Sequence, residues 1–345
     1  MEGWKLKEGT ISFKQIDDFE VMSLIFRALG PSSARTTSYK FCFFKSLLDN
    51  LFNADNRNLS IPFRNIFTTF TSIYYNLIVK WDLFQMSSKN NTVCSIRKII
   101  ENFVVEYPQL NGTFIPFESL KSSLQIELIN RVQREGMKYV IGAFYGDTNG
   151  QIFNFSKKER IVWLNPSAYK TLVRQKNMFE KINYFEWMKF LEKCNENDKL
   201  CRLTSKIDES TKRINLTQYR DFLFYSGQHR CAYCGKELSI SKTKTPVDHI
   251  IPWSFVKDDK LWNLTLSCKS CNSKKSNKLP KNNFIRYAVR RNNIIQQKYK
   301  NTNLVKLDFK NYSEDKYKKI YESALLNGFD DEYYICKYNE NYLLI

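Results

Sequence analysis

The 345-residue sequence has no long hydrophobic run and only two histidines. Its longest apolar stretch, residues 66–79, is interrupted by Thr, Ser and Asn and is shorter than the roughly 20 residues that a membrane span requires. The residues after Met1 lack the apolar core of a signal peptide, and neither an internal repeat nor a low-complexity segment occurs. These absences argue against a membrane protein or an exported one, so we expect a globular cytoplasmic protein without a membrane partner.

Positive charge is concentrated in one part of the chain. The formal net charge is +19, and residues 211–300 hold 19 basic side chains against 5 acidic ones. Clustered cations bind nucleic acid because they release counterions from its phosphate backbone. Lys supplies 38 of the 54 basic residues, as in proteins of AT-rich genomes, so a compositional bias can also account for the charge. The concentration of charge favours a nucleic-acid partner, and double-stranded DNA is the partner we expect.

The first 210 residues are predicted to form a mainly helical region. Apolar residues recur every three or four positions, with Thr36 or Thr37 placed to cap the first helix and Pro62 placed as the first residue of the second. The aromatic residues in these repeats are expected to form core rather than a ligand pocket. The helices predicted in this way run from the first cap to residue 51 and over residues 62–81, 95–106 and 117–134.

The pattern then changes. Residues 140–144 and 151–155 flank a turn rich in Gly, which predicts a small β-hairpin. Asn165 is placed to cap a helix that runs to about residue 176, and another helix is predicted near Tyr184–Lys193. The polar stretch Asn195–Arg213 is predicted to be a linker. We expect a regulatory, recognition or partner-binding role for this N-terminal region, with a protein partner or a homo-oligomer as its possible complexes.

Four of the nine cysteines form two close pairs, Cys231/Cys234 and Cys268/Cys271. In a cytoplasmic protein this C-x2-C spacing favours a metal site over disulfides. Four thiolates complete the tetrahedral shell of Zn²⁺ and leave no position for water, so the pairs predict a structural zinc that joins two distant parts of the chain. His229 precedes the first pair and is a less favoured alternative ligand. The remaining cysteines are predicted to be small core residues: Cys42, Cys94, Cys194, Cys201 and Cys336.

The residues between the two cysteine pairs predict two strands and a helix. Asp248 and His249 lie in one strand-like stretch, and residues 262–266 form a second one after a polar loop. A brief helix follows and must end near Pro280. Adjacent residues of a strand point to opposite faces, so Asp248 and His249 project together only if the backbone is distorted or the helix supplies further ligands. With the helical N-terminal region, this zinc-clamped ββα unit predicts an α+β fold.

This segment resembles the HNH, or ββα-metal, endonucleases, most closely those with a cysteine zinc clamp. The stretch DHIIPWSFVKDDKLWNL is also similar to the HNH domain of RNA-guided CRISPR effector nucleases, and the resemblance covers about residues 228–280. The three positions of the family motif are His249, Asn263 and Asn272, with Asn in place of the final His. We therefore expect three parts in the chain: residues 1–210, an HNH endonuclease domain at residues 211–300 and a C-terminal extension at residues 301–345.

The resemblance implies a role for each residue of the motif. Asp248 and Asn272 bind the catalytic cation, Mg²⁺ or Mn²⁺, for which carboxylate and amide oxygens are suitable ligands. His249 takes a proton from the attacking water, a task for which an ordinary imidazole is suited at neutral pH. Asn263 orients either the loop or the ring of His249. Asn277 is the alternative to Asn272 as the ligand from the helix.

Several residues are candidates for contact with nucleic acid. Lys275, on the brief helix, is expected to reach a phosphate. Trp253 and Trp262 flank the polar loop and either stack on bases or pack against the zinc lobe. Three arginines fall on one side of a helix predicted after the motif, where they either follow phosphates or form a solvated face: Arg286, Arg290 and Arg291.

The function expected from these features is that of a metal-dependent DNA endonuclease, with restriction or anti-phage defence as its setting. One alternative is a zinc module that binds nucleic acid without cutting it. The joint presence of Asp248, His249, Asn263 and Asn272 argues against that alternative, because a scaffold requires none of them. The other alternative is an RNA-cleaving toxin built on the same fold, which only the choice of substrate would distinguish.

Overall fold

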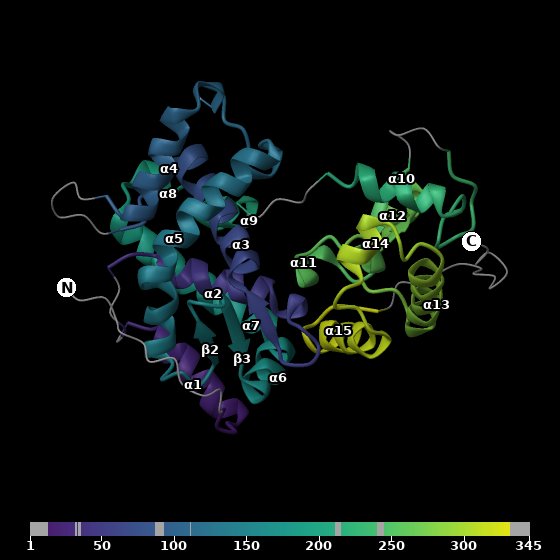
Figure 1. Ribbon diagram of the computed structural model, residues 1–345, viewed down its shortest axis with the longest axis horizontal. Helices are drawn as coiled ribbons and strands as arrows, with labels where there is room; N and C mark the ends of the chain where they lie inside the picture. Colours follow the sequence, from purple (N-terminus) through teal and green to yellow (C-terminus); the bar gives the residue numbers. More distant parts are fainter. Residues whose placement is uncertain are drawn as a thin grey trace. The chain divides into compact units, whose positions relative to one another are not determined.

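The computed structural model describes residues 13–31, 33, 36–86, 93–110, 112–210, 215–239 and 245–331. Contacts between residues divide the chain into two compact units, residues 1–213 and 214–345, whose α-helices are labelled in Figure 1. Within the described ranges, no helix combines the length and the apolar character that crossing a bilayer requires. Cys336 lies outside the described residues.

The first unit consists of helices packed around a small sheet. The antiparallel strands β1 (Ser60–Pro62), β3 (Ile161–Leu164) and β2 (Phe153–Ser156) lie in that order. Single 3-10 turns occupy Leu51–Asn53, Pro108–Leu110 and Phe117–Ser119. The helices are α1 (Asp18–Leu29), α2 (Tyr39–Asp49), α3 (Phe63–Tyr75) with a π-helical continuation at Asn76–Lys80, α4 (Ser95–Glu106), α5 (Ser122–Asp147), α6 (Pro166–Arg174), α7 (Lys176–Cys194), α8 (Asn197–Leu200) and α9 (Leu203–Glu209). The prediction of a mainly helical region with a small sheet is confirmed.

Aromatic side chains form the core of this unit, as their helical spacing predicts. Phe43 and Phe44 of α2 lie against Phe144 of α5, with ring centroids 5.7 and 5.2 Å apart. A side chain at Gly136 of α5 would collide with the ring of Phe67 on α3. The absence of a side chain at this position therefore allows α3 and α5 to approach closely.

The expected strand at residues 140–144 is wrong, because this segment continues α5 to Asp147. The turn that follows ends this helix rather than joining two strands. Asn149 and Gly150 there have φ angles of +52° and +66°, a conformation that stops helical hydrogen bonding. The hairpin lies further along the chain, where β2 pairs with β3.

Two helix starts and the expected linker also differ from the prediction. The residue before α2 is Ser38, which makes no capping bond with its side chain, so neither Thr36 nor Thr37 has that place. Pro62 ends β1 and precedes the first residue of α3. The described part of the stretch 195–213 is largely helical, because it contains α8 and α9, and Ile207 of α9 is buried in the core.

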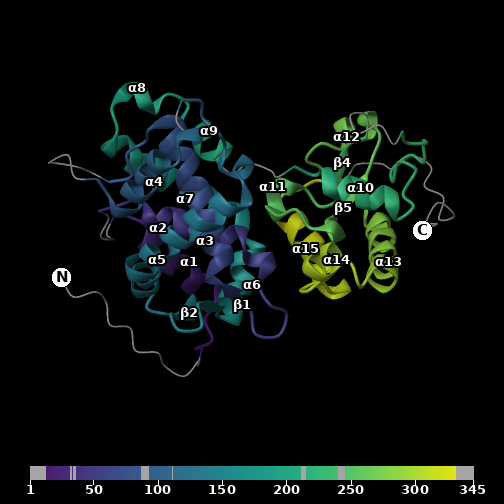
Figure 2. The same cartoon turned by 45° about the horizontal axis from the view of Figure 1, so that its top comes forward.

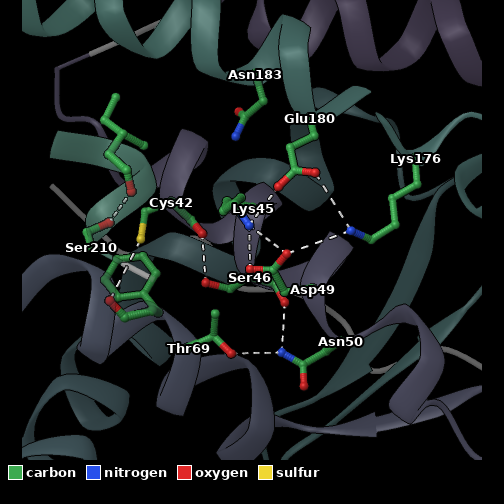
Figure 3. Close-up of polar contacts among 12 residues, drawn as sticks. Cys42, Lys45, Ser46, Asp49, Asn50, Thr69, Lys176, Glu180, Asn183 and Ser210 are labelled. Atoms are coloured by element: carbon green, nitrogen blue, oxygen red, sulfur yellow. Dashed lines mark hydrogen bonds and ion pairs between the residues drawn. The ribbon is translucent and has the colours of Figure 1, made fainter. Parts of the chain in front are cut away.

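Four charged side chains are buried between α2 and α7 (Figure 3). Nζ of Lys45 lies 2.5 Å from Oδ2 of Asp49 and 2.9 Å from Oε1 of Glu180. Nζ of Lys176 approaches the same two carboxylates at 3.9 and 3.8 Å. Burial alone would lower the pKa of Lys45, but the two carboxylates raise it well above its ordinary value. Two positive and two negative charges are thus paired inside the core.

The second unit is built on a two-stranded antiparallel sheet, β4 (Val247–His249) with β5 (Leu264–Leu266), in which Asp248 pairs with Thr265. Figure 2 shows this sheet with α12 on one side and α13 to α15 on the other. A 3-10 turn, Leu261–Asn263, leads into β5. The helices of this unit are α10 (Thr217–Tyr225), α11 (Trp253–Val256), α12 (Lys269–Lys275), α13 (Asn282–Lys298), α14 (Asn303–Asp308) and α15 (Glu314–Leu326).

Residues beyond 300 pack against the loop that precedes β5. Oδ2 of Asp308, at the end of α14, accepts a hydrogen bond of 2.7 Å from the backbone N–H of Leu261. The ring of Trp262 lies against Tyr317 of α15, with centroids 5.5 Å apart. Trp262 is therefore buried against α15, a contact that differs from both of its expected roles, stacking on bases and packing against the zinc lobe.

Candidate active site and thiol cluster

Four sulfur atoms gather next to β5. The thiols of Cys231, Cys234, Cys268 and Cys271 lie within 4.8 Å of one another. Sγ of Cys234 is 3.8 Å from Sγ of Cys268, and sulfurs bound at about 2.3 Å to a central zinc stand about 3.8 Å apart in a tetrahedron. Gly235, with a φ of +71°, makes the turn after the first pair. The predicted four-cysteine cluster is confirmed, and its spacing fits a tetrahedral ion.

Ionisation of all four thiols would require a bound cation. Burial raises the pKa of the Cys231 thiol to about 11. Burial acts in the same direction on Cys268, but hydrogen bonding led by the Cys271 backbone N–H lowers the pKa of Cys268 below its ordinary value. Four thiolates this close together repel one another, so a cation is needed to hold them ionised. The cluster is tied to β5 because the N–H of Ala232 donates to the carbonyl of Leu266 at 3.0 Å.

His229 is separate from the thiol cluster. Its Nε2 lies 3.2 Å from the backbone oxygen of Phe224, and the two rings are 6.1 Å apart. Among the described residues, the metal-binding cluster contains the four cysteines and no histidine. The alternative in which His229 replaces a cysteine as a zinc ligand is therefore not supported.

Asp248, on β4, is held by two buried donors. The hydroxyl of Tyr233, which lies within the first cysteine pair, donates to Oδ2 of Asp248 at 2.6 Å. Burial, and then the nearby Asp248 carboxylate, raise the pKa of Tyr233 well above its usual range, so the hydroxyl keeps its proton. Nζ of Lys275 lies 3.2 Å from the same carboxylate oxygen. Asp248 therefore connects the thiol cluster with α12.

Lys275 is buried, which rules out its expected contact with a phosphate. Its side chain is 0% exposed. Besides pairing with Asp248, its ammonium donates to the backbone oxygen of His249 at 2.6 Å. A sequence pattern that places a lysine on a short helix does not show which face of the helix is buried, and here that face packs on β4.

His249 has a different partner from its neighbour Asp248. Its Nε2 lies 2.7 Å from Oδ1 of Asp259, in the loop between α11 and the Leu261–Asn263 turn. The two side chains are largely buried, with 4% of His249 and 8% of Asp259 exposed. The buried imidazole and carboxylate thus form a pair.

Asn263 contacts the backbone that follows His249 rather than its ring. Its Oδ1 accepts from the N–H of Ile251 at 2.9 Å, and its Nδ2 donates to the carbonyl of Ile251 at 2.8 Å. The backbone oxygen of Asn263 also accepts from the N–H of Ile250 at 2.8 Å. These three bonds fix the turn at the end of β4.

The two candidate asparagines of the helix differ in position. Asn272 is half-buried and lies one turn before Lys275 on α12, so these two side chains share a helix face. That face is directed to β4 because Lys275 reaches Asp248. Asn277 lies beyond the end of α12, is exposed and accepts from the hydroxyl of Ser254 at 2.5 Å.

The arginines of α13 fall into two groups. Arg286 and Arg290, one turn apart, are exposed. Arg291 is not on that face: it is 1% exposed, and its guanidinium donates to the backbone oxygen of Leu264 at 2.5 Å. Arg291 was expected on the same helix face as the other two arginines, but it ties α13 to β5 instead.

Trp253 is half-buried, with Nζ of Lys257 4.8 Å from the ring centroid.

Three residues of the site were not identified from the sequence: Tyr233, Asp259 and Tyr219. The hydroxyl of Tyr219, on α10, donates to the backbone oxygen of Asp259 at 2.7 Å. A signal existed for Asp259, since the polar loop contains two adjacent carboxylates between lysines. A tyrosine within a C-x2-C pair gives no comparable signal, because a buried tyrosine combines ring packing with a hydrogen bond from its hydroxyl in many settings.

Comparison with known proteins identifies this part of the chain. Residues 231–281 match the family model described as HNH endonuclease. A 102-residue stretch is 32% identical to the CRISPR-associated endonuclease Cas9 of Streptococcus mutans serotype c, covering 27% of this chain and 8% of that protein. The chain thus spans less than a tenth of the length of this curated relative. No solved structure matches the chain. The second unit therefore carries an HNH endonuclease domain with a four-cysteine cluster.

Proposed function

We propose that this protein is a metal-dependent endonuclease that hydrolyses phosphodiester bonds in double-stranded DNA. One observation carries the proposal: adjacent residues of β4 supply a carboxylate held by Tyr233 and Lys275 and an imidazole held by Asp259. Burying charged and titratable groups in this way is costly unless they have a task or a partner, and such groups cluster at active sites. The segment that contains them is the one that matches the HNH endonuclease model.

Two metals have separate roles in the proposal. Zinc in the thiol cluster is structural, because four sulfurs leave it no open position. Mg²⁺ or Mn²⁺ is the catalytic cation, and Asp248 and Asn272 are its protein ligands. Oδ2 of Asp248 is engaged by Tyr233 and Lys275, so Oδ1 is the oxygen offered to a cation. A divalent cation held by Asp248 and Asn272 would neutralise charge on the scissile phosphate and on the leaving oxygen.

The remaining chemistry is proton transfer and positioning. His249 removes one proton from a water molecule as the water oxygen forms a bond to phosphorus. The bond from phosphorus to the leaving sugar oxygen breaks, and that oxygen takes up a proton from solvent. The bonds of Asn263 to Ile251 fix the backbone beyond His249, and Lys275 fixes the backbone oxygen of His249 itself. These contacts hold the base in place during the reaction.

The charge distribution supports a nucleic-acid substrate. Residues 211–300 carry most of the net positive charge of the chain, and Arg286 and Arg290 expose part of it on α13. We place the protein in restriction or anti-phage defence in the cytoplasm, where free thiols stay reduced. The N-terminal unit is proposed to supply recognition, regulation or binding of a protein partner or a second copy.

Cleavage assays on a panel of substrates test the proposal. The purified protein is incubated with double-stranded DNA, single-stranded DNA and RNA of the same sequence, with Mg²⁺, Mn²⁺ or EDTA. We expect cleavage of duplex DNA that EDTA abolishes. Cleavage of RNA alone would favour the toxin alternative. Binding of duplex DNA without cleavage under any metal condition would favour the zinc module that does not cut.

A further inference from the structure

The loop that carries Asp259 is fixed independently of His249. The hydroxyl of Tyr219, on α10, donates to the backbone oxygen of Asp259 at 2.7 Å. Two residues later, the N–H of Leu261 donates to Oδ2 of Asp308, on α14, at 2.7 Å. Burial, with Asp308 next in importance, raises the pKa of Tyr219 well above its usual range, so its hydroxyl remains a donor. Two helices from different parts of the sequence therefore set the position of Asp259.

The contact between Asp259 and His249 has a chemical direction. An ionised carboxylate only accepts hydrogen bonds, whereas a neutral imidazole has one nitrogen that donates and one that accepts. With an ionised carboxylate at Asp259, the contact of 2.7 Å between its Oδ1 and Nε2 of His249 requires the hydrogen on Nε2. The other ring nitrogen, Nδ1, then has the free electron pair.

We propose that Asp259 is a positioning residue that fixes His249 in the Nε2–H tautomer and makes Nδ1 the atom that takes the proton of the attacking water. This inference deepens the proposed nuclease function and rests on it for the identity of the proton donor. As Nδ1 takes the proton, the imidazole becomes a cation that faces the Asp259 carboxylate. The proton leaves Nδ1 for solvent after the phosphodiester bond has broken, which restores the starting tautomer.

A purely structural pair would behave differently. If Asp259 only fills its place in the fold, replacing its charge affects stability and leaves the turnover of the folded protein unchanged. If it selects the tautomer, an amide at this position disturbs the base, because an amide can donate to Nε2 and favour hydrogen on Nδ1. In a Ser-His-Asp hydrolase, the corresponding carboxylate-to-amide change lowers turnover about 10⁴-fold while the geometry is kept.

Nitrogen NMR of the imidazole rings tests the tautomer without any activity measurement. The full chain contains only His229 and His249, so histidine labelled with ¹⁵N in the ring gives two ring systems, and a His229→Gln variant assigns them. We expect Nε2 of His249 to show the signal of a protonated ring nitrogen and Nδ1 that of an unprotonated one. The reverse pattern, or rapid exchange between the two tautomers, would overturn the inference even if the protein cuts DNA. The expected pattern would stand even if the assayed DNA is not the substrate.

Kinetics of matched variants supply the second test. Asp259→Asn is expected to lower kcat about 10²- to 10⁴-fold, with KM for DNA nearly unchanged, and to alter the nitrogen signals of His249. Asp259→Glu, which keeps the charge, is expected to recover part of the loss. Asp315→Asn is the matched control, because this exposed carboxylate lies in the first turn of α15, and the variant should give the turnover of the parent. An Asp259→Asn protein that is folded and as active as the parent would contradict the inference.

Discussion

Removing the metal from the thiol cluster is expected to unfold the second unit and leave the first unit folded. The two cysteine pairs bracket the segment that forms β4 and β5, and the N–H of Ala232 binds the last residue of β5. Binding of a structural zinc contributes about 10–16 kcal/mol of apparent free energy. The net stability of a domain is only about 5–15 kcal/mol. A unit that folds around the cluster therefore has little or no stability left without the metal.

The first unit has no such dependence. Its core consists of aromatic and aliphatic side chains on α2, α3, α5 and α7, and the four cysteines of the cluster all belong to the second unit. Hydrogen exchange read by mass spectrometry separates the two units peptide by peptide. After treatment with a strong zinc chelator, we expect amides of β4 and β5 to exchange at the rate of an unfolded chain. Amides of α2 and α3 should retain the protection that they have in the metal-loaded protein.

A matched pair of variants controls this experiment. Cys268→Ser removes a ligand and should reproduce the effect of the chelator, whereas Cys201→Ser changes an exposed cysteine outside the cluster and should have none. Metal analysis verifies that the chelated sample contains no zinc. Continued protection of β4 and β5 in such a sample would refute the argument that the ion holds this unit together. Loss of protection in α2 and α3 would refute the independence of the two units.

Three further outcomes follow from other contacts. Tyr233→Phe removes the hydroxyl that donates to Asp248. A hydrogen bond to a charged group contributes about 1.5–3 kcal/mol, so kcat should fall about tenfold or more at unchanged zinc content. Unchanged kinetics would show that this hydroxyl is dispensable. Lys45→Met leaves two buried carboxylates without their closest cation and should cost about 3–5 kcal/mol in chemical denaturation. Changing both Arg286 and Arg290 to Gln should weaken DNA binding. The negative slope of log affinity against log salt concentration should become shallower by about 1.8. An unchanged slope would mean that these arginines do not contact phosphate.

The parts of the site that were predictable depend on local chemistry. Two C-x2-C pairs restrict the ligand set so strongly that the thiol cluster followed from spacing alone. The strands around Asp248 and before Cys268 were predictable as well, because short apolar stretches ended by Pro or by a polar loop are typical of buried strands. The cap at Asn165 belongs to the same group, since its side chain accepts from the N–H of Ser167 at 3.0 Å.

The parts that were not predictable depend on contacts between distant residues. Lys275 and Arg291 have the composition of a nucleic-acid surface, yet both are buried by their partners on β4 and β5. The pairing of His249 with Asp259 requires a loop conformation that Tyr219 on α10 helps to fix. Residues 140–144 were predicted as a strand from their local pattern, whereas their packing against other helices places them in α5.

Comparison of the two histidines tests the central claim most directly. The parent protein, His249→Ala and His229→Ala are each incubated with supercoiled plasmid and Mg²⁺ or Mn²⁺ at equal zinc content. We expect the parent and His229→Ala to convert the plasmid to nicked or linear DNA and EDTA to block both, whereas His249→Ala should leave the plasmid supercoiled. Cleavage by His249→Ala at the rate of the parent would contradict it.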